Sequence, residues 1–203
     1  MGMMIKILFF CLTCFVVNAT SDTPSRYATE MDFISKLGKE AIDTLTCKEL
    51  SDDERKRRFE VIFIKDFAVE KIAHFTLGRY AKKTTPEERT EFLELFKKTI
   101  ADIYAQRFKN YDNEQFKVEN ARALSPQTVL VKSKIVRPSG DPIDVDWKIV
   151  RDPEANIKIG DVIVEGISMS VTQRSDFTAT IQNHGGKVSD LNRVLQNKLN
   201  APS

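Results

Sequence analysis

The sequence predicts an α+β fold in which N-terminal and C-terminal helices pack on a four-stranded antiparallel sheet. Three observations support this prediction. Hydrophobic residues recur at helical spacing from about residue 26 to residue 110, they alternate with polar residues between about residues 116 and 164, and helical spacing returns near residue 177. Runs of helix on either side of a run of strands are typical of the α+β class.

The composition excludes several classes of protein. Of the 203 residues, 41% are hydrophobic, and 31 Lys and Arg balance 29 Asp and Glu. Only 8 Gly and 7 Pro are present, which excludes collagen-like and low-complexity chains. Because the charges nearly cancel, nothing in the composition indicates a nucleic-acid partner.

The first 19 residues have the pattern of a secretory signal peptide. Lys6 precedes an apolar run over residues 7–17, and Ala19 ends a small-residue cleavage pattern. The run is shorter than the roughly 20 residues that a membrane-spanning helix needs, so an uncleaved anchor is the less favoured alternative. We therefore expect removal of residues 1–19 and an exported domain over residues 20–203. Cys47 is then the one remaining cysteine, which excludes an intramolecular disulfide.

Four helices are expected before residue 110. The first is amphipathic, and the second begins at a capping box of Ser51 and Glu54. Asp66 is expected to cap the third helix, and Thr85 with Glu88 to cap the fourth. The fourth helix carries a continuous apolar stripe at spacings of three and four: Phe92, Leu95, Phe96, Ile100, Ile103, Tyr104 and Phe108.

Two central strands are expected to form a hairpin about a turn at residues 138–142. A shorter strand is expected around residues 116–118 and a last one over residues 157–164. Two C-terminal helices follow, separated by Gly185 and Gly186. The inward positions of the hairpin are Val129, Val131, Ile135, Ile143, Val145, Trp147 and Ile149.

The sequence offers little for catalysis or metal binding. His74, His184 and Cys47 lie outside motif distance of one another, so we expect no metal site. Residues 166–170 resemble a nucleophile elbow but lack its second glycine. A basic run over residues 55–58 fits either a solvated helix face or a surface that meets anionic lipid or an acidic partner.

Phenylalanine is concentrated in the helical half of the chain. Ten remain after residue 19, and eight of these lie between Phe33 and Phe108. On helices that face a sheet of Val, Ile and Trp, such residues either fill a core or line an apolar cavity between the two layers. Periodicity fits both arrangements, so a solid core and a hollow one both stay open at this point.

Several segments of the chain resemble one known family. They are LGRY at 77–80, TPEER at 85–89 with Phe92, Phe96 and Tyr104, and KIGDVIVEGIS at 158–168 followed by Arg174 and Phe177. In this order they resemble the MlaC family of periplasmic phospholipid-binding, toluene-tolerance proteins, over nearly all of the chain after residue 19. Two departures bear on the edge of a pocket: Ile157 stands where the family often has an aromatic residue, and Thr172-Gln173 replaces an Asn-Tyr pair.

The resemblance implies a non-enzymatic, monomeric carrier that moves phospholipid through the periplasm and supports the lipid asymmetry of the outer membrane. Its implied partners are an outer-membrane lipoprotein–porin complex and an inner-membrane ABC transporter with an MCE-domain protein. The implied fold is an NTF2-like cone whose apolar cavity holds the acyl chains between sheet and helices. The lipid is cargo, and no cofactor is implied.

We expect the wall of that cavity to combine the inward positions of the sheet with the helical stripe. Because bilayer and cavity are both apolar, lipid transfer between them is expected to be close to neutral, so its direction has to come from partners. The headgroup is expected to stay near solvent, since burial of an unpartnered phosphate is costly. The expected lipid-binding residues are Phe92, Phe96, Ile100, Tyr104, Val129, Val131, Ile135, Val145, Trp147, Ile149 and Phe177.

Two other classes of protein fit the same fold. An NTF2-like cavity enzyme of the isomerase or dehydratase type would use Asp161, Tyr104 or His74, and it requires an inward carboxylate with a raised pKa. An adaptor protein with a solid core would bind no lipid. A co-purifying diacyl lipid would separate the carrier from both alternatives.

Overall fold

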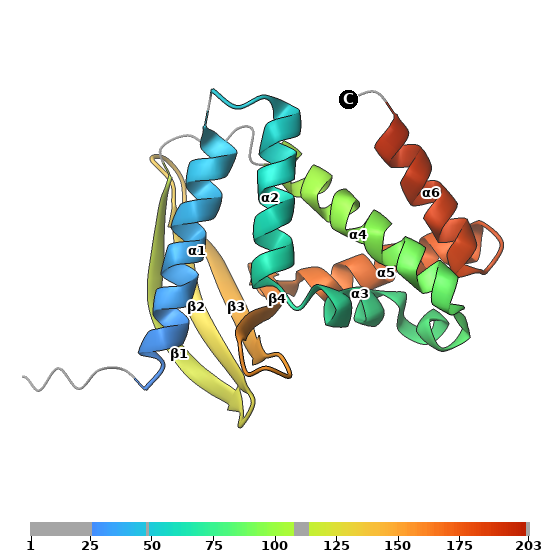
Figure 1. Ribbon diagram of the computed structural model, residues 1–203. Helices are drawn as coiled ribbons and strands as arrows, with labels where there is room; N and C mark the ends of the chain where they lie inside the picture. Colours follow the sequence, from blue (N-terminus) through green and yellow to red (C-terminus); the bar gives the residue numbers. More distant parts are fainter. Residues whose placement is uncertain (1–25, 48, 108–113, 202–203) are drawn as a thin grey trace, which may run out of the picture.

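The described part of the chain has helices at both ends and a sheet in the middle (Figure 1). The computed structural model describes residues 26–47, 49–107 and 114–201, so the predicted signal peptide lies outside the described residues. The helices are α1 (Ala28–Thr46), α2 (Asp52–Asp66), α3 (Val69–Leu77), the 3-10 helix η1 (Gly78–Lys83), α4 (Pro86–Arg107), α5 (Met169–Asn183) and α6 (Val188–Asn200). The strands are β1 (Gln115–Ser125), β2 (Thr128–Val136), β3 (Ile143–Arg151), β4 (Ile157–Val164) and β5 (Ile167–Ser168).

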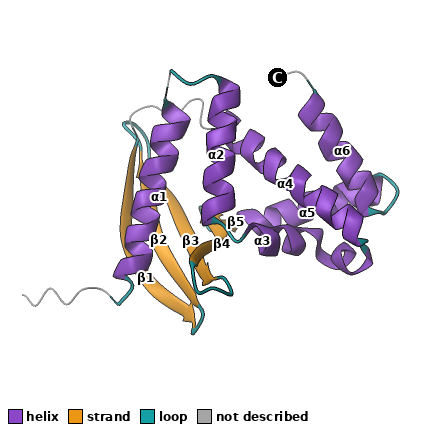
Figure 2. Ribbon diagram, viewed as in Figure 1, coloured by secondary structure: helices purple, strands orange, loops and turns teal. Residues whose placement is uncertain are grey.

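The sheet is an antiparallel meander in which β1 to β5 lie side by side in chain order. This arrangement confirms the predicted α+β class (Figure 2). The prediction of four strands missed β5, which has two residues and pairs Ile163 with Ser168 and Val164 with Ile167. Two residues are too few to show an alternating pattern, so periodicity could not reveal this strand.

The helices take two positions relative to the sheet (Figure 1). α1 and α2 lie over one face, where α1 contacts β1 and β2. α3, α5 and α6 form a helical lobe beside the sheet, and α4 runs from this lobe back to α2. α6 packs against α4 and α5, whereas the start of α5 contacts β4 and β5. The C-terminal helices therefore reach the sheet at the beginning of α5.

The start of α4 is fixed by the predicted capping box. Thr85 Oγ1 accepts a hydrogen bond from the backbone N–H of Glu88 at 3.2 Å, and the Glu88 carboxylate accepts one from the N–H of Thr85 at 3.1 Å. At α2, Ser51 Oγ accepts from the N–H of Glu54 at 3.2 Å, which confirms the Ser51 half of the predicted capping box, whereas the Glu54 carboxylate binds Arg57 and Arg58 instead of the N–H of Ser51. Both helices begin where a side chain satisfies backbone donors that lack a partner in the helix.

The predicted cap at Asp66 is wrong. Asp66 is the last residue of α2, and α3 begins after Ala68 without a side-chain cap. The sheet replaces the cap, because the N–H of Ala68 donates to the carbonyl of Ile159 in β4 at 2.8 Å. Phe67 and Ile159 also form a parallel bridge. A contact between distant segments thus ends one helix and starts the next, which local sequence does not indicate.

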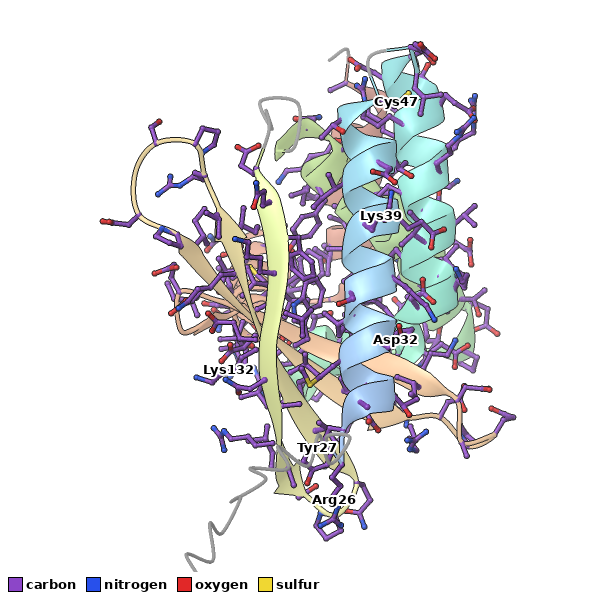
Figure 3. All side chains as sticks on the ribbon, turned by 90° about the vertical axis from the view of Figure 1, so that its left-hand side faces the viewer. Arg26, Tyr27, Asp32, Lys39, Cys47 and Lys132 are labelled. Atoms are coloured by element: carbon purple, nitrogen blue, oxygen red, sulfur yellow. The ribbon has the colours of Figure 1, made fainter. Side chains whose placement is uncertain are left out.

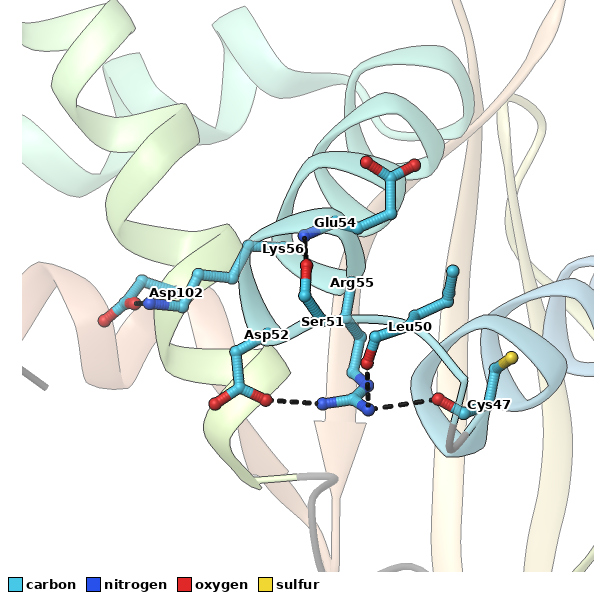
Figure 4. Close-up of polar contacts among 8 residues, drawn as sticks. All are labelled: Cys47, Leu50, Ser51, Asp52, Glu54, Arg55, Lys56 and Asp102. Atoms are coloured by element: carbon cyan, nitrogen blue, oxygen red, sulfur yellow. Dashed lines mark hydrogen bonds and ion pairs between the residues drawn. The ribbon is translucent and has the colours of Figure 1, made fainter.

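The connection from α1 to α2 is closed by Arg55 (Figure 4). Its guanidinium donates to Asp52 at 2.7 Å and to the carbonyls of Cys47 and Leu50 at 3.0 and 3.1 Å. The side chain is 11% exposed. The first residue of the basic run is therefore a structural link between two helices.

The other three residues of the basic run are also paired within the protein. Lys56 Nζ lies 2.6 Å from Asp102 of α4, and this hydrogen bond raises the pKa of Lys56 above its ordinary value (Figure 4). Arg57 and Arg58 both form ion pairs with Glu54. Because all four basic groups have carboxylate partners, the structure favours the helix-surface interpretation of this run.

Two large hydrophobic cores and a small cluster of Phe59, Ala101 and Ala105 hold the fold together. The helical core lies among α2 to α6, and the sheet core lies where α1 and α2 pack on the sheet. The helical core consists of Phe63, Val69, Ala73, Leu77, Ala81, Phe92, Leu95, Phe96, Ile100, Phe177, Ile181, Val188, Leu191 and Leu195. The sheet core consists of Ile34, Leu37, Ile62, Val131, Ile149 and Ile159.

Candidate functional site

A cavity of about 630 Å³ lies between the sheet and the helices and opens to solvent. Its volume falls in the range of small-molecule sites, which is roughly 300–1,000 Å³. Figure 3 views the side chains between α1 and the sheet from the side. The helices and their junctions contribute Leu37, Gly38, Ala41, Ile42, Phe59, Ile62, Phe63, Phe67, Ile72, Phe96, Ile100 and Tyr104. The sheet contributes Phe116, Ile135, Ile143, Val145, Trp147, Val162 and Val164.

The structure brings part of the expected lipid-binding set to this cavity. Phe96, Ile100 and Tyr104 line it from α4, and Ile135, Val145 and Trp147 line it from β2 and β3. The remaining expected residues lie outside the lining and belong to the cores or pack against them: Phe92, Val129, Val131, Ile149 and Phe177.

Some of the expected residues lie outside the lining because side chains from other helices and strands cover them. Phe92 and Phe177 meet edge to face in the helical core, with ring centroids 5.6 Å apart. Val131 is fully buried and Ile149 nearly so, both in the sheet core. Strand alternation and helical phase indicate that a side chain points inward, but not whether another helix covers it. The sequence therefore places these residues inside without distinguishing core from wall.

The sequence reasoning missed the contribution of α1 and α2 to the cavity. Leu37, Ala41 and Ile42 of α1 line it, as do Phe59 and other residues of α2. The signal was present, because these residues lie on the apolar faces of amphipathic helices. A helix face that is apolar along its whole length can pack solidly at one end and line a cavity at the other.

Trp147 is held in the wall by a buried serine. Its indole Nε1–H donates to Ser133 Oγ at 2.9 Å, and Ser133 Oγ–H donates to the carbonyl of Val145 at 2.7 Å. Ser133 is 1% exposed, so the Ser133 hydroxyl and the indole N–H of Trp147 form hydrogen bonds within the protein in place of hydrogen bonds to water. The polar atom of the largest wall residue is therefore satisfied inside the sheet, and its ring is left to the cavity.

Phe116 closes the wall between the edge strand β1 and α1. Its ring meets that of Trp147 edge to face, with centroids 6.0 Å apart. On the other side it touches α1 at Gly38, where a Cβ would lie 2.3 Å from Phe116 Cδ1. Only a residue without a side chain lets the ring approach the helix so closely.

The candidate catalytic groups do not form a catalytic arrangement in this structure. Asp161 is buried and lines the cavity, but Oδ2 accepts from Ser168 Oγ–H at 2.6 Å and Oδ1 accepts from the N–H of Ser170 at 3.1 Å. It therefore stabilises the start of α5. Tyr104 lies in the wall beside Phe59, and His74 is exposed on α3 outside the lining.

Charged groups near the cavity occur mainly at its rim. Arg137 and Glu165 are exposed, whereas Glu114 is half-buried. Among the described residues, no three His, Cys, Asp or Glu side chains converge in a way that could hold a metal ion. Within the same part of the chain, no helix is both long and apolar enough to cross a membrane.

The wall and the fold that positions it can be compared with known proteins. Residues 35–197 match the family described as MlaC protein. The chain belongs to the MlaC family. The matched segment contains the helical core and all of the sheet core except Ile34, since it runs from within α1 to within α6.

Individual MlaC relatives and a solved structure agree with this membership. The chain is 26% identical over 117 residues to the toluene tolerance protein ttg2D of Pseudomonas putida, which is 58% of this chain and 53% of that protein. It is 29% identical over 96 residues to the intermembrane phospholipid transport system binding protein MlaC of Haemophilus influenzae, 46% of this chain and 45% of that protein. The chain thus spans about half the length of these curated relatives.

The fold is shared with a phospholipid-binding protein from Ralstonia solanacearum, whose structure was solved in complex with a phospholipid. The TM-score is 0.70 at 18% sequence identity, and the match covers 83% of this chain and 96% of that one. At this identity the likeness establishes the common fold, with the helices and the open antiparallel sheet in the same arrangement.

Proposed function

We propose that this chain is a non-enzymatic phospholipid carrier which holds acyl chains in the cavity between the sheet and the helices. The observation that carries the proposal is the apolar cavity of about 630 Å³ in a chain of the MlaC family. The MlaC family is a family of non-enzymatic lipid carriers, and the Haemophilus influenzae relative is named as a phospholipid transport binding protein.

The hydrophobic effect explains why a lipid carrier needs such a wall. Two acyl chains contain about 30 CH₂ groups, each worth roughly 0.8 kcal/mol when removed from water, so free lipid in water is disfavoured by on the order of 20 kcal/mol. A cavity that replaces the bilayer interior removes most of this cost. Transfer between bilayer and cavity is then close to neutral, and partners set its direction.

The proposed setting is the periplasm, reached through removal of residues 1–19. The proposed donor and acceptor are an outer-membrane lipoprotein–porin complex and an inner-membrane ABC transporter with an MCE-domain protein. Membership of the MlaC family and the name of the Haemophilus influenzae relative support this assignment. The carrier is expected to act as a monomer, because its cavity is complete within one chain.

A pair of matched substitutions tests the proposal. Ile42 lines the cavity from α1, whereas Ile64 of α2 is 46% exposed and lies outside the lining. We expect Ile42→Glu to lower the amount of co-purifying lipid about tenfold or more, because acyl chains would have to cover a carboxylate. We expect Ile64→Glu to leave loading unchanged. Lipid extraction and native mass spectrometry of the purified proteins measure both.

Two results would contradict the proposal. One is an absence of diacyl lipid in every preparation of the wild-type protein, including protein incubated with phospholipid vesicles. The other is equal lipid loading in Ile42→Glu and the wild type, with circular dichroism showing that both are folded. The first result would favour the adaptor and enzyme interpretations over the carrier. The second would show that the lipid binds elsewhere on the molecule.

A further inference from the structure

We infer that Arg137 binds the phosphate of the bound phospholipid at the mouth of the cavity. The inference rests on the proposed function, since it assigns a partner to the part of the lipid that an apolar wall cannot bind. The observations come from the end of the cavity beside the turn between β2 and β3.

Arg137 directly follows β2 and is an exposed residue of the cavity lining. Ile135, two residues earlier, pairs with Ile143 across the hairpin, and both line the apolar wall. Arg137 lines the same cavity and is exposed to solvent. Of the described residues that form the lining, it is the one with a positive charge. A guanidinium thus lies where apolar wall meets water, and the headgroup of an inserted lipid has to emerge at such a boundary.

The turn between β2 and β3 holds this guanidinium in place. Nε and Nη2 of Arg137 donate to the carbonyl of Asp141 at 3.0 and 2.5 Å. Gly140 has a φ of +89°, and a Cβ at this position would lie 3.4 Å from Arg137 Nη2, an ordinary contact distance, so the turn lies next to the guanidinium. An arginine has five N–H donors, and those that do not face Asp141 stay available to a ligand.

The charge of Arg137 is not neutralised by the protein. Within the part of the chain that the structure describes, no carboxylate forms an ion pair with it. Other cations of the sheet differ in this respect: Lys134 lies 3.1 Å from Glu119, and Arg151 lies 2.9 Å from Glu30. A carbonyl partner orients the guanidinium but leaves its full positive charge for an anion.

Two of the three carboxylates of the lining, those of Asp161 and Glu165, have other partners; the third, Glu114, precedes Gln115, which pairs with Val136. Asp161 accepts hydrogen bonds from Ser168 and from the N–H of Ser170. Glu165 accepts one from the N–H of Asp144 at 2.5 Å. Neither of these two carboxylates forms an ion pair with Arg137, so neither competes with a lipid phosphate for its guanidinium.

The chemistry of the group determines which ligand it takes. A guanidinium presents parallel N–H donors that match two oxygens of a phosphate, and such charge-assisted pairs are stronger than neutral hydrogen bonds. A phosphodiester in a lipid and a free phosphate share this chemistry. The apolar wall that begins at Ile135 favours the lipid, because acyl chains in the cavity would bring their own phosphate to its rim.

The test compares phospholipid with a lipid that lacks phosphate. The full chain and its variants are incubated with vesicles of equal parts phosphatidylethanolamine and diacylglycerol with identical acyl chains, and the bound lipids are quantified by mass spectrometry. We expect the wild type to prefer phosphatidylethanolamine, and Arg137→Gln to lower that preference about fivefold, a modest factor because the site is exposed. Total lipid loading is expected to stay the same.

A matched control removes a cation from β2, the strand that Arg137 follows. Lys132 lies on the sheet away from α1 (Figure 3) and does not line the cavity, so we expect Lys132→Gln to keep the wild-type preference. A wild-type preference in Arg137→Gln with normal loading would overturn the assignment of Arg137 and leave the proposed function standing. An equal loss of preference in Lys132→Gln would also overturn it, since long-range charge alone would then explain the effect. Failure of the wild type to load either lipid would reject the proposed function itself.

A ligand without acyl chains tests whether Arg137 binds the phosphate of a lipid or a free phosphate. Calorimetric titration of the full chain with glycerol 3-phosphate at millimolar concentration is expected to show no saturable binding. Saturable binding that Arg137→Gln removes would assign the guanidinium to a free phosphate and overturn the lipid assignment.

Discussion

At the scale of single residues, buried polar groups in this protein position the cavity wall. Ser133 fixes the indole of Trp147, and Asp161 fixes the first turn of α5, where Ser170 also lines the cavity. Each group has hydrogen-bond partners inside the protein, so neither is held ready for proton transfer. This is why a cavity with a buried carboxylate in its lining fits a carrier better than an enzyme.

Asp66 is different, because it is 6% exposed and its partner is the exposed side chain of Lys65, at 3.6 Å. Burial raises the pKa of its carboxyl above the ordinary value, although Lys65 at 3.6 Å opposes the effect and Glu40 adds to it. The Asp66 carboxyl therefore binds its proton more tightly in the folded chain than in the unfolded chain. As pH rises through the raised pKa, ionisation of Asp66 lowers the free energy of unfolding.

Asp66→Asn is expected to remove this pH-dependent loss. As pH falls toward about 4, near the ordinary pKa of an Asp carboxyl, the melting temperatures of wild type and variant are expected to converge, and toward neutral pH the variant is expected to become the more stable. Thermal unfolding between about pH 4 and pH 7 measures the difference. Asp32→Asn, at an exposed carboxylate, is the control. A variant that loses stability relative to the wild type as pH rises would contradict this account of Asp66.

At the scale of elements, α1 and the edge strand β1 are fitted to each other at one position. Gly38 costs α1 helical stability, since glycine is about 1 kcal/mol worse than alanine in a helix interior. The structure explains the cost by the ring of Phe116, which occupies the space of the missing side chain. The wall between helix and sheet is closed by this contact.

Gly38→Ala is expected to lower the free energy of unfolding by roughly 1 kcal/mol, because crowding of about 1–3 kcal/mol exceeds the gain in helix propensity. Urea unfolding measures the change. The same substitution in a Phe116→Leu background is expected to cost less, since the smaller side chain can move away. An identical loss in both backgrounds would show that the contact with Phe116 is not the cause.

Local sequence predicted most elements of this fold, and the wrong prediction at Asp66 shows what it cannot reveal. Thr85 and Glu88 start α4 as expected, because a capping box is complete within four residues. Asp66 does not start α3, because the turn there is set by a hydrogen bond between Ala68 and Ile159, about ninety positions apart. Elements defined by neighbours in sequence could be predicted, and those defined by contacts between distant segments could not.

At the scale of the whole molecule, the cavity lies between the sheet and the helices, beside the two cores that Phe67 connects. Phe92 and Val131 both point inward as predicted, yet each is enclosed by a core, whereas Trp147 and Ile100 also line the cavity. Which inward residues form the wall depends on how α1, α2 and α4 lie over the sheet. Periodicity in the sequence does not reveal how the helices lie over the sheet. The sequence therefore predicted an apolar wall, but only some of the residues that form it.

A ligand that fills this cavity is expected to stabilise the whole fold. With lipid at about 100 times its dissociation constant, linkage contributes about 2.7 kcal/mol, or roughly 5–10 °C in melting temperature for a domain of this size. Calorimetry of loaded and delipidated protein measures the shift. Ile42→Glu, which is expected not to load, serves as the control and is expected to show no shift. Equal melting temperatures for loaded and delipidated wild type would contradict the cavity as the binding site.

The junction between α2 and α3 ties these helices to the sheet beside the cavity, which Phe67 lines. There Ala68 is hydrogen-bonded to Ile159, Phe67 bridges to the same residue, and Lys158 donates to the carbonyl of Lys65. Widening the cavity at this junction would break backbone hydrogen bonds between the α2–α3 connection and β4. We therefore expect a bulkier lipid to be accommodated by side chains of the lining elsewhere, with this connection unchanged.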